Sequence, residues 1–76
     1  MTTRHLKIFL NVYITGSMTA AAQKLYMTQP SVSQAIRELE EHYGVPLFER
    51  LYRKLYPTQA SKQLFLYAEK ILGMFD

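Results

Sequence analysis

Apolar side chains recur at the three- and four-residue spacing of an amphipathic helix in four segments of the chain. This spacing predicts helices over residues 3–15, 18–25, 28–43 and 58–76. The expected buried positions are, in chain order, Leu6, Phe9, Leu10 and Tyr13; Met18, Ala21, Ala22 and Leu25; Val32, Ile36, Leu39 and Tyr43; and Leu64, Ala68, Ile71 and Phe75, with Phe65 and Leu72 beside the last group. Residues 47–57 mix apolar, aromatic and basic side chains without this period, which predicts a short β-hairpin.

The residues between these segments are suited to end one helix and to begin the next. Gly16 and Gly44 favour the left-handed conformation that ends a helix. The hydroxyl residues Ser17, Thr28 and Thr58 are suited to be N-caps. The hydroxyl of Thr28 should accept a hydrogen bond from the backbone N–H of Ser31, because Pro30 has no N–H to donate. The third helix is therefore predicted to begin at a well-defined residue.

The second and third predicted helices are separated only by residues 26–28. So short a connection does not allow an antiparallel pair and predicts a steep crossing, as in a helix-turn-helix. Ala21 and Ala22 are small enough to let another helix cross close by. In a helix-turn-helix the second helix presents its exposed N-terminal side to DNA bases, so the polar face of residues 28–43 is the candidate site.

That polar face carries side chains that can pair with bases or phosphates. A spacing of about 100° per residue places Pro30, Gln34, Arg37 and Glu41 opposite the apolar positions, with Ser33 on the flank. Glutamine can pair with adenine and arginine with guanine. The first acid is Glu38, so the N-terminal turns combine the positive end of the helix dipole with an absence of carboxylates. Such a face is either simply solvated or suited to nucleic acid.

Charge is unevenly distributed along the chain. Residues 1–37 hold four basic residues and no acid, and residues 50–62 hold four more, again without an acid. Four glutamates lie between these two stretches, at 38, 40, 41 and 49. The net charge of +3 is modest, but the segregation favours a folded surface with one face suited to a polyanion.

Other features narrow the class of protein. Cysteine is absent, which excludes disulfides and thiol chemistry. No apolar stretch approaches the roughly 20 residues that span a bilayer, and the N-terminus lacks the apolar core of a secretory signal. We therefore expect a soluble cytoplasmic protein without membrane contact. A core built from 76 residues is marginal, so a stabilising partner chain is expected.

The sequence SMTAAAQKLYMTQPSVSQAIRELEEHYGVPLFER closely resembles the helix-turn-helix of LysR-type regulators, and RHLKIFLNVYITG fits the opening of that family. The resemblance covers essentially the whole chain. It implies a mainly α fold, a winged helix-turn-helix with a three-helix core, a short β-hairpin wing and a C-terminal linker helix. Residues 1–57 would form the DNA-binding domain, and residues 58–76 the start of the linker and dimerisation helix.

The resemblance implies sequence-specific DNA binding by a bacterial LysR-type transcription regulator. Recognition helix 28–43 would lie in the major groove, and wing 50–56 would lie at the adjacent minor groove. Implied DNA-binding residues are Gln29, Pro30, Ser33 and Gln34 at bases; Ser31, Arg37, Ser17 and Thr19 at phosphates; Thr28 beside them; and Arg53 with Lys54 at the minor groove. Implied dimerisation residues are Leu64, Phe65, Ala68, Ile71, Leu72 and Phe75.

The family also implies partners beyond DNA. The chain would form a homodimer, and the full-length protein a higher oligomer. The effector domain that senses a small-molecule inducer would be absent, and no cofactor or metal is expected.

The sequence departs from the family pattern at four positions. The family usually has a glycine at the tip of the wing, where this chain has Leu51-Tyr52, and a positive φ without glycine costs about 1 kcal/mol or more. Pro57 removes one strand donor. Ser61 stands where glycine is usual and is expected to push the last helix slightly outward. Gln34 is often basic in the family, so its neutrality should weaken nonspecific binding.

Two other functions were weighed against DNA binding. An enzyme is disfavoured because the only aspartate is Asp76, and His5 and His42 belong to different helices. The chain also has no HxxxH pair and no glycine-rich phosphate loop. The stronger alternative is a winged helix that binds only protein. Steep salt dependence would distinguish a DNA-binding domain from such a module.

Overall fold

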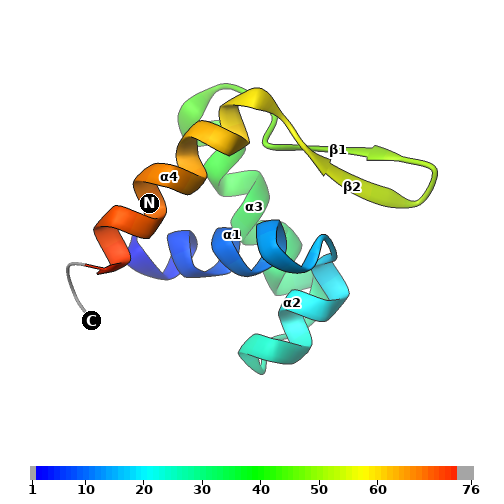
Figure 1. The fold of residues 1–76 in the computed structure, drawn as a ribbon. Helices are drawn as coiled ribbons and strands as arrows, with labels where there is room; N and C mark the ends of the chain where they lie inside the picture. The colour runs from blue at the N-terminus through cyan, green and yellow to red at the C-terminus, as the bar shows by residue number, and fades with distance from the viewer. Residues whose placement is uncertain (1, 74–76) are drawn as a thin grey trace.

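The computed structural model describes residues 2–73 as four helices and a two-stranded antiparallel hairpin (Figure 1). The elements are α1 (Thr3–Thr15), α2 (Met18–Leu25), α3 (Gln29–Tyr43), β1 (Phe48–Leu51), β2 (Lys54–Pro57) and α4 (Gln59–Gly73). All six predicted elements are present, in the predicted order. The predicted continuation of the last helix to residue 76, which includes Phe75, lies outside the described residues.

The helix ends have the predicted caps. Gly16 and Gly44 take the left-handed conformation, with φ of 68° and 70°. The Ser17 hydroxyl accepts a hydrogen bond from the backbone N–H of Ala20 at 3.1 Å. The Thr28 hydroxyl accepts one from Ser31 at 3.3 Å, as the proline at the second helical position requires. The sharp turns on either side of α2 are therefore determined locally.

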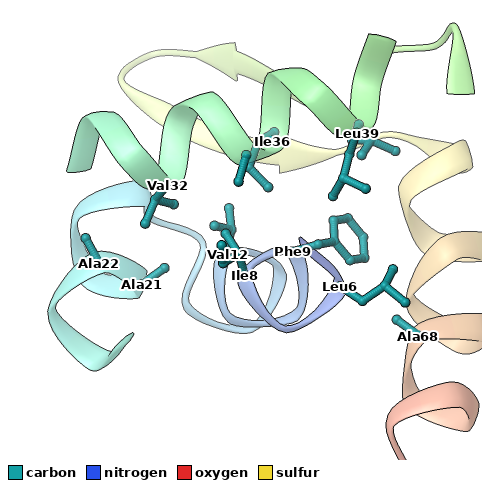
Figure 2. Close-up of a cluster of buried hydrophobic side chains, with 12 residues drawn as sticks. Leu6, Ile8, Phe9, Val12, Ala21, Ala22, Val32, Ile36, Leu39 and Ala68 are labelled. Atoms are coloured by element: carbon teal, nitrogen blue, oxygen red, sulfur yellow. The ribbon is translucent and has the colours of Figure 1, made fainter. Parts of the chain in front are cut away.

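Helix α1 lies at the centre of the core, in contact with α2, α3 and α4 (Figure 2). Because neighbours cover it on more than one side, α1 buries a wider surface than the single predicted stripe. Ile8 and Val12 are as fully buried as Phe9, although the spacing had assigned them no role. On α3, Val32, Ile36 and Leu39 point toward α1 in Figure 2, and Ala35 is buried as well.

The assignment of Tyr43 to the core was wrong. Its side chain is 41% exposed and lies in the last turn of α3. It lines an open groove with Val45, Leu47 and Leu64 because none of residues 2–73 covers this side of α4. The groove has a volume of about 420 Å³ and is mainly apolar.

The base of the hairpin is attached to the helices by three kinds of contact. The backbone N–H of Leu47 donates to a Glu40 carboxylate oxygen at 2.7 Å, and that of Thr58 donates to the Leu47 carbonyl at 3.0 Å. The rings of Phe48 and Phe9 lie 5.7 Å apart. The Thr58 hydroxyl also caps α4 by accepting from the N–H of Ser61. The wing therefore emerges from a fixed base.

The turn of the hairpin lies one residue later than expected. Leu51 pairs with Lys54, which leaves Tyr52 and Arg53 as the two turn residues, not Leu51 and Tyr52. Their φ values are 51° and 64°, and a two-residue turn with both φ positive is type I′. The left-handed conformation costs about 1–2 kcal/mol for each non-glycine residue. The register of four cross-strand pairs determines the position of the turn and therefore imposes this cost.

Ser61 is completely buried in the first turn of α4. Its hydroxyl has no hydrogen-bond partner among residues 2–73. The replacement of the usual glycine is thus accommodated inside the fold, but it leaves an unpaired polar group there.

None of the helices described for residues 2–73 is both long and apolar enough to cross a membrane.

Candidate nucleic-acid interface

The N-terminal half of α3 is open to solvent, as DNA recognition requires. The side chains of Thr28, Pro30, Ser31, Gln34 and Arg37 are exposed. There is no acid in the first turn. The first carboxylate, that of Glu38, lies on the flank of α3, where its oxygen is 3.0 Å from the Nε2 of His5 on α1. This end of the helix therefore presents its dipole and its polar side chains without a competing negative charge.

Polar side chains along this face are paired with each other. The guanidinium of Arg37 donates to the Gln34 side-chain oxygen at 2.7 Å. The Gln29 amide donates to the Ser33 hydroxyl at 2.6 Å. The Thr28 hydroxyl donates to that of Ser31 at 2.8 Å. These contacts between helical neighbours orient the donors and acceptors of this face.

A polar depression of about 180 Å³ brings three elements together beside this face. It is lined by Gly16, Ser17, Met18, Thr19, Gln29, Arg50, Arg53 and Leu55. Four of the predicted DNA-binding residues, Ser17, Thr19, Gln29 and Arg53, thus border one cleft, although they are up to 36 positions apart in the sequence. A second shallow depression, which shares Met18, Arg50 and Leu55 with the first, runs past Ser33 and Arg37 and is also lined by the acid Glu40. The two together form a polar strip from the N-terminus of α2 to the hairpin.

Arg50 borders both depressions, and the sequence analysis did not assign it a site role. It pairs with Leu55 across the hairpin and lies two residues after Phe48, on the same face. The alternation of side chains along β1 could have predicted this position. Because Phe48 faces the helices, Arg50, two residues later, faces them too. Its charge and its place between α2, α3 and the wing suit it to a phosphate.

Lys54 is separated from these basic residues. Side chains alternate along β2, so Lys54 lies on the opposite face from Leu55, which lines the depressions. It is exposed and borders neither depression. Of the two basic residues predicted at the minor groove, the structure therefore brings only Arg53 to the polar strip.

The predicted dimerisation residues of α4 partly cover their own domain. Ala68 is completely buried against that core, so its side chain is not available to a partner. Phe65 stacks on Tyr13 of α1, with ring centroids 4.3 Å apart. Leu64, Ile71 and Leu72 are partly buried against the core as well. The exposed face of α4 instead carries Leu66 and Tyr67, which are 65% and 69% exposed and were not assigned.

The two histidines lie apart in the fold, on α1 and α3. Across residues 2–73 no three His, Cys, Asp or Glu side chains are grouped as a metal site. His5 is paired with Glu38, whereas His42 packs edge-on against Tyr43 at the C-terminal end of α3.

Two packed helices joined by a short turn, a third helix that supports them and a hairpin beside the exposed end of α3 define a winged helix-turn-helix. Residues 3–62 match the family model of the bacterial regulatory helix-turn-helix proteins of the LysR family. The chain belongs to the LysR family.

Relatives and solved structures agree with this assignment. The chain is 42% identical over 93% of its length to a probable RuBisCO transcriptional regulator of Cyanidioschyzon merolae and to the HTH-type transcriptional regulator DgcR of a Pseudoalteromonas species. It covers 23% and 24% of these proteins, so it spans about a quarter of the length of the curated relatives it matches.

Among solved structures, the crystal structure of a BenM_DBD/catB site 1 DNA complex is similar over 100% of this chain and 85% of that one. The TM-score is 0.95 and the identity 39%. The LysR family transcriptional regulator CbnR is similar over 97% of this chain and 26% of that one, with a TM-score of 0.91 and an identity of 36%.

Proposed function

We propose that this chain is the sequence-specific DNA-binding domain of a LysR-type transcription regulator. The observation that carries the proposal is the exposed, acid-free N-terminal half of α3, continuous with a polar strip that Arg50 and Arg53 border. The BenM_DBD structure with which this chain shares its fold is a DNA complex, which supports the same function. We assign the DNA-binding unit to residues 1–57 and the start of a linker helix to residues 58–76.

In this proposal α3 lies in the major groove. An α-helix with its side chains is about 10–12 Å across, and the major groove of B-DNA is about 12 Å wide. Gln34 and Arg37 project from the exposed side and carry the donors and acceptors that distinguish adenine and guanine. The contact between them uses one of the five N–H groups of the Arg37 guanidinium, so further donors of Arg37 and the amide nitrogen of Gln34 can pair with a base.

The N-terminus of α2 and the wing contact the DNA backbone on either side. Ser17, Thr19 and Arg50 border the cleft between these elements, where a phosphate would meet hydroxyl donors and a positive charge. Arg53 follows at the tip of the wing and would reach the minor groove, which attracts arginine most strongly where it is narrow. These contacts fix the register of α3 on the duplex.

Selection of bound duplexes from a random pool, followed by affinity measurements at several salt concentrations, tests this function. We expect an enriched motif and a log–log slope of affinity against salt of about −0.9 for each neutralised phosphate. A protein-binding winged helix would enrich no motif and would show little salt dependence. That result would exclude the DNA-binding function.

We also propose that two copies of the chain associate through α4. The exposed Leu66 and Tyr67 support this, as does the apolar groove that Tyr43, Val45 and Ile71 line. A domain of this size buries a limited core, and a second copy would cover apolar surface that now meets water. A two-fold dimer would place two α3 helices on paired half-sites, so the selected motif should be a pseudo-palindrome.

A further inference from the structure

The tip of the hairpin is strained at two consecutive residues. Tyr52 and Arg53 have φ of 51° and 64°, in a region that L residues with a side chain avoid. Glycine would relieve the strain at either position, and the regular strands on both sides would accept it. Strain that persists where it is easily removed points to a function of the side chain.

The fold does not account for the side chain of Tyr52. It is 93% exposed. Within residues 2–73 its ring takes part in none of the aromatic contacts, which involve Phe9, Tyr13, His42, Tyr43, Phe48 and Phe65. Its hydroxyl makes no hydrogen bond with another described residue, and the ring lines neither polar depression. A large aromatic side chain in water, held in a strained conformation, therefore contributes little to folding.

The position of Tyr52 suggests what it binds. The hairpin extends away from the four helices, and the turn is its far end (Figure 1). Arg53 and Lys54 follow directly, and Arg50 lies two residues before. The only acid of the hairpin, Glu49, pairs with Tyr56 further from the tip. The tip thus offers an aromatic ring with a hydroxyl in a basic environment.

We propose that Tyr52 is a DNA-binding residue that contacts the sugar–phosphate backbone at the edge of the minor groove approached by Arg53. The ring would pack on a deoxyribose, and the hydroxyl would donate to the neighbouring phosphate. This inference rests on the proposed DNA-binding function. Sugar and phosphate are the same at every base pair, so Tyr52 raises affinity without changing sequence preference.

Two substitutions at this position test the inference with the duplex that the wild-type chain selects from a random pool. Tyr52→Phe keeps the ring and removes the hydroxyl, and we expect affinity to fall about tenfold, as for a lost hydrogen bond to a charged group. Tyr52→Gly should bind more weakly still, while its unfolding temperature rises by about 4 °C because the strain is relieved. Opposite changes in affinity and stability would not arise from a purely structural residue.

Matched variants separate this contact from its neighbours. Tyr56→Phe removes a hydroxyl from the same hairpin, on the face away from the polar strip, and should stay within about twofold of wild type. Two further duplexes place the selected motif between AT-rich flanks or between GC-rich flanks. The ratio of wild-type to Tyr52→Phe affinity should be the same on both. The loss of affinity caused by Arg53→Ala should be smaller with GC-rich flanks, because narrow AT-rich grooves attract arginine.

The outcomes distinguish the inference from the function on which it rests. If wild type binds with the expected salt dependence and both Tyr52 variants bind equally well, the role of Tyr52 is wrong and the DNA-binding function stands. A fall of affinity and stability together in Tyr52→Gly would also refute it, by making Tyr52 a structural residue. If wild type selects no duplex, both proposals fail.

Discussion

Two serines in this chain show how the surroundings of a hydroxyl determine its contribution to stability. Ser17 caps α2 by accepting the backbone N–H of Ala20, whereas Ser61 is completely buried in α4 without a partner. A capping hydroxyl satisfies a donor that the helix leaves open. A buried hydroxyl without a partner has lost its hydrogen bond to water and gained nothing in return.

Ser61→Ala should therefore stabilise the protein. We expect the free energy of unfolding, measured by urea denaturation, to rise by about 1 kcal/mol. Ser17→Ala is the matched control and should lower it by about 1 kcal/mol through loss of the cap. A lower stability of Ser61→Ala would mean that its hydroxyl has a partner in solution.

Gln34→Ala should change base preference at one position of the selected motif. If Gln34 contacts adenine through two hydrogen bonds, discrimination there should fall by about 1–3 kcal/mol. Ser31→Ala, at an exposed residue assigned to a phosphate, should weaken binding to all duplexes alike. An unchanged motif for Gln34→Ala would remove this residue from those that read bases.

The residues of the polar strip were largely predictable, because polar face and capping pattern are local properties of the sequence. The way in which these residues are grouped in space could not be predicted from the sequence. Arg50 joins Ser17 and Gln29 only because the hairpin folds back beside α2 and α3. Lys54, next to Arg53 in the chain, is turned to the other face by the alternation along β2.

At the scale of elements, the junction between α3 and the hairpin decides where the wing lies. The Glu40 carboxylate accepts the backbone N–H of Leu47, seven residues away and just before β1. Thr58 then ties the end of β2 to Leu47 and caps α4. Both contacts attach the base of the hairpin and leave its tip free to meet a ligand.

Glu40→Ala should loosen the wing. The N–H of Leu47 would lose its charged acceptor, and we expect the free energy of unfolding to fall by about 1.5 kcal/mol. Amide hydrogen exchange should become faster across residues 47–57. Glu41→Ala, at the exposed neighbouring acid, should change stability by less than about 0.5 kcal/mol. Equal effects of the two substitutions would contradict a specific role for Glu40.

At the scale of the whole molecule, apolar surface remains uncovered along α4. Leu66 and Tyr67 are exposed, and the groove that Tyr67 lines also includes Tyr43 and Val45. Phe65 and Ala68, in contrast, pack on the chain's own core. The helix therefore packs one face on its own domain and leaves the other exposed to solvent.

Leu66→Asp should shift the chain from dimer to monomer in sedimentation velocity. A charge at this position would be buried without a partner in the dimer, but it is solvated in the monomer, so the fold itself should be unaffected. Ile14→Asp is the matched control, because Ile14 is 64% exposed on α1, outside the proposed interface. Sedimentation of wild type and Leu66→Asp at the same mass would show that this face of α4 does not associate.

The sequence alone determined the four helices, the hairpin and the caps at Gly16, Ser17, Thr28, Gly44 and Thr58, because periodicity, glycine at helix ends and hydroxyl N-caps act over a few residues. It also determined the acid-free end of α3. Only the tertiary structure decided how wide a surface α1 buries, that Tyr43 lines an open groove, and that the hairpin turns at Tyr52-Arg53. Burial and strand register depend on which neighbours cover a residue, and those neighbours come from distant parts of the chain.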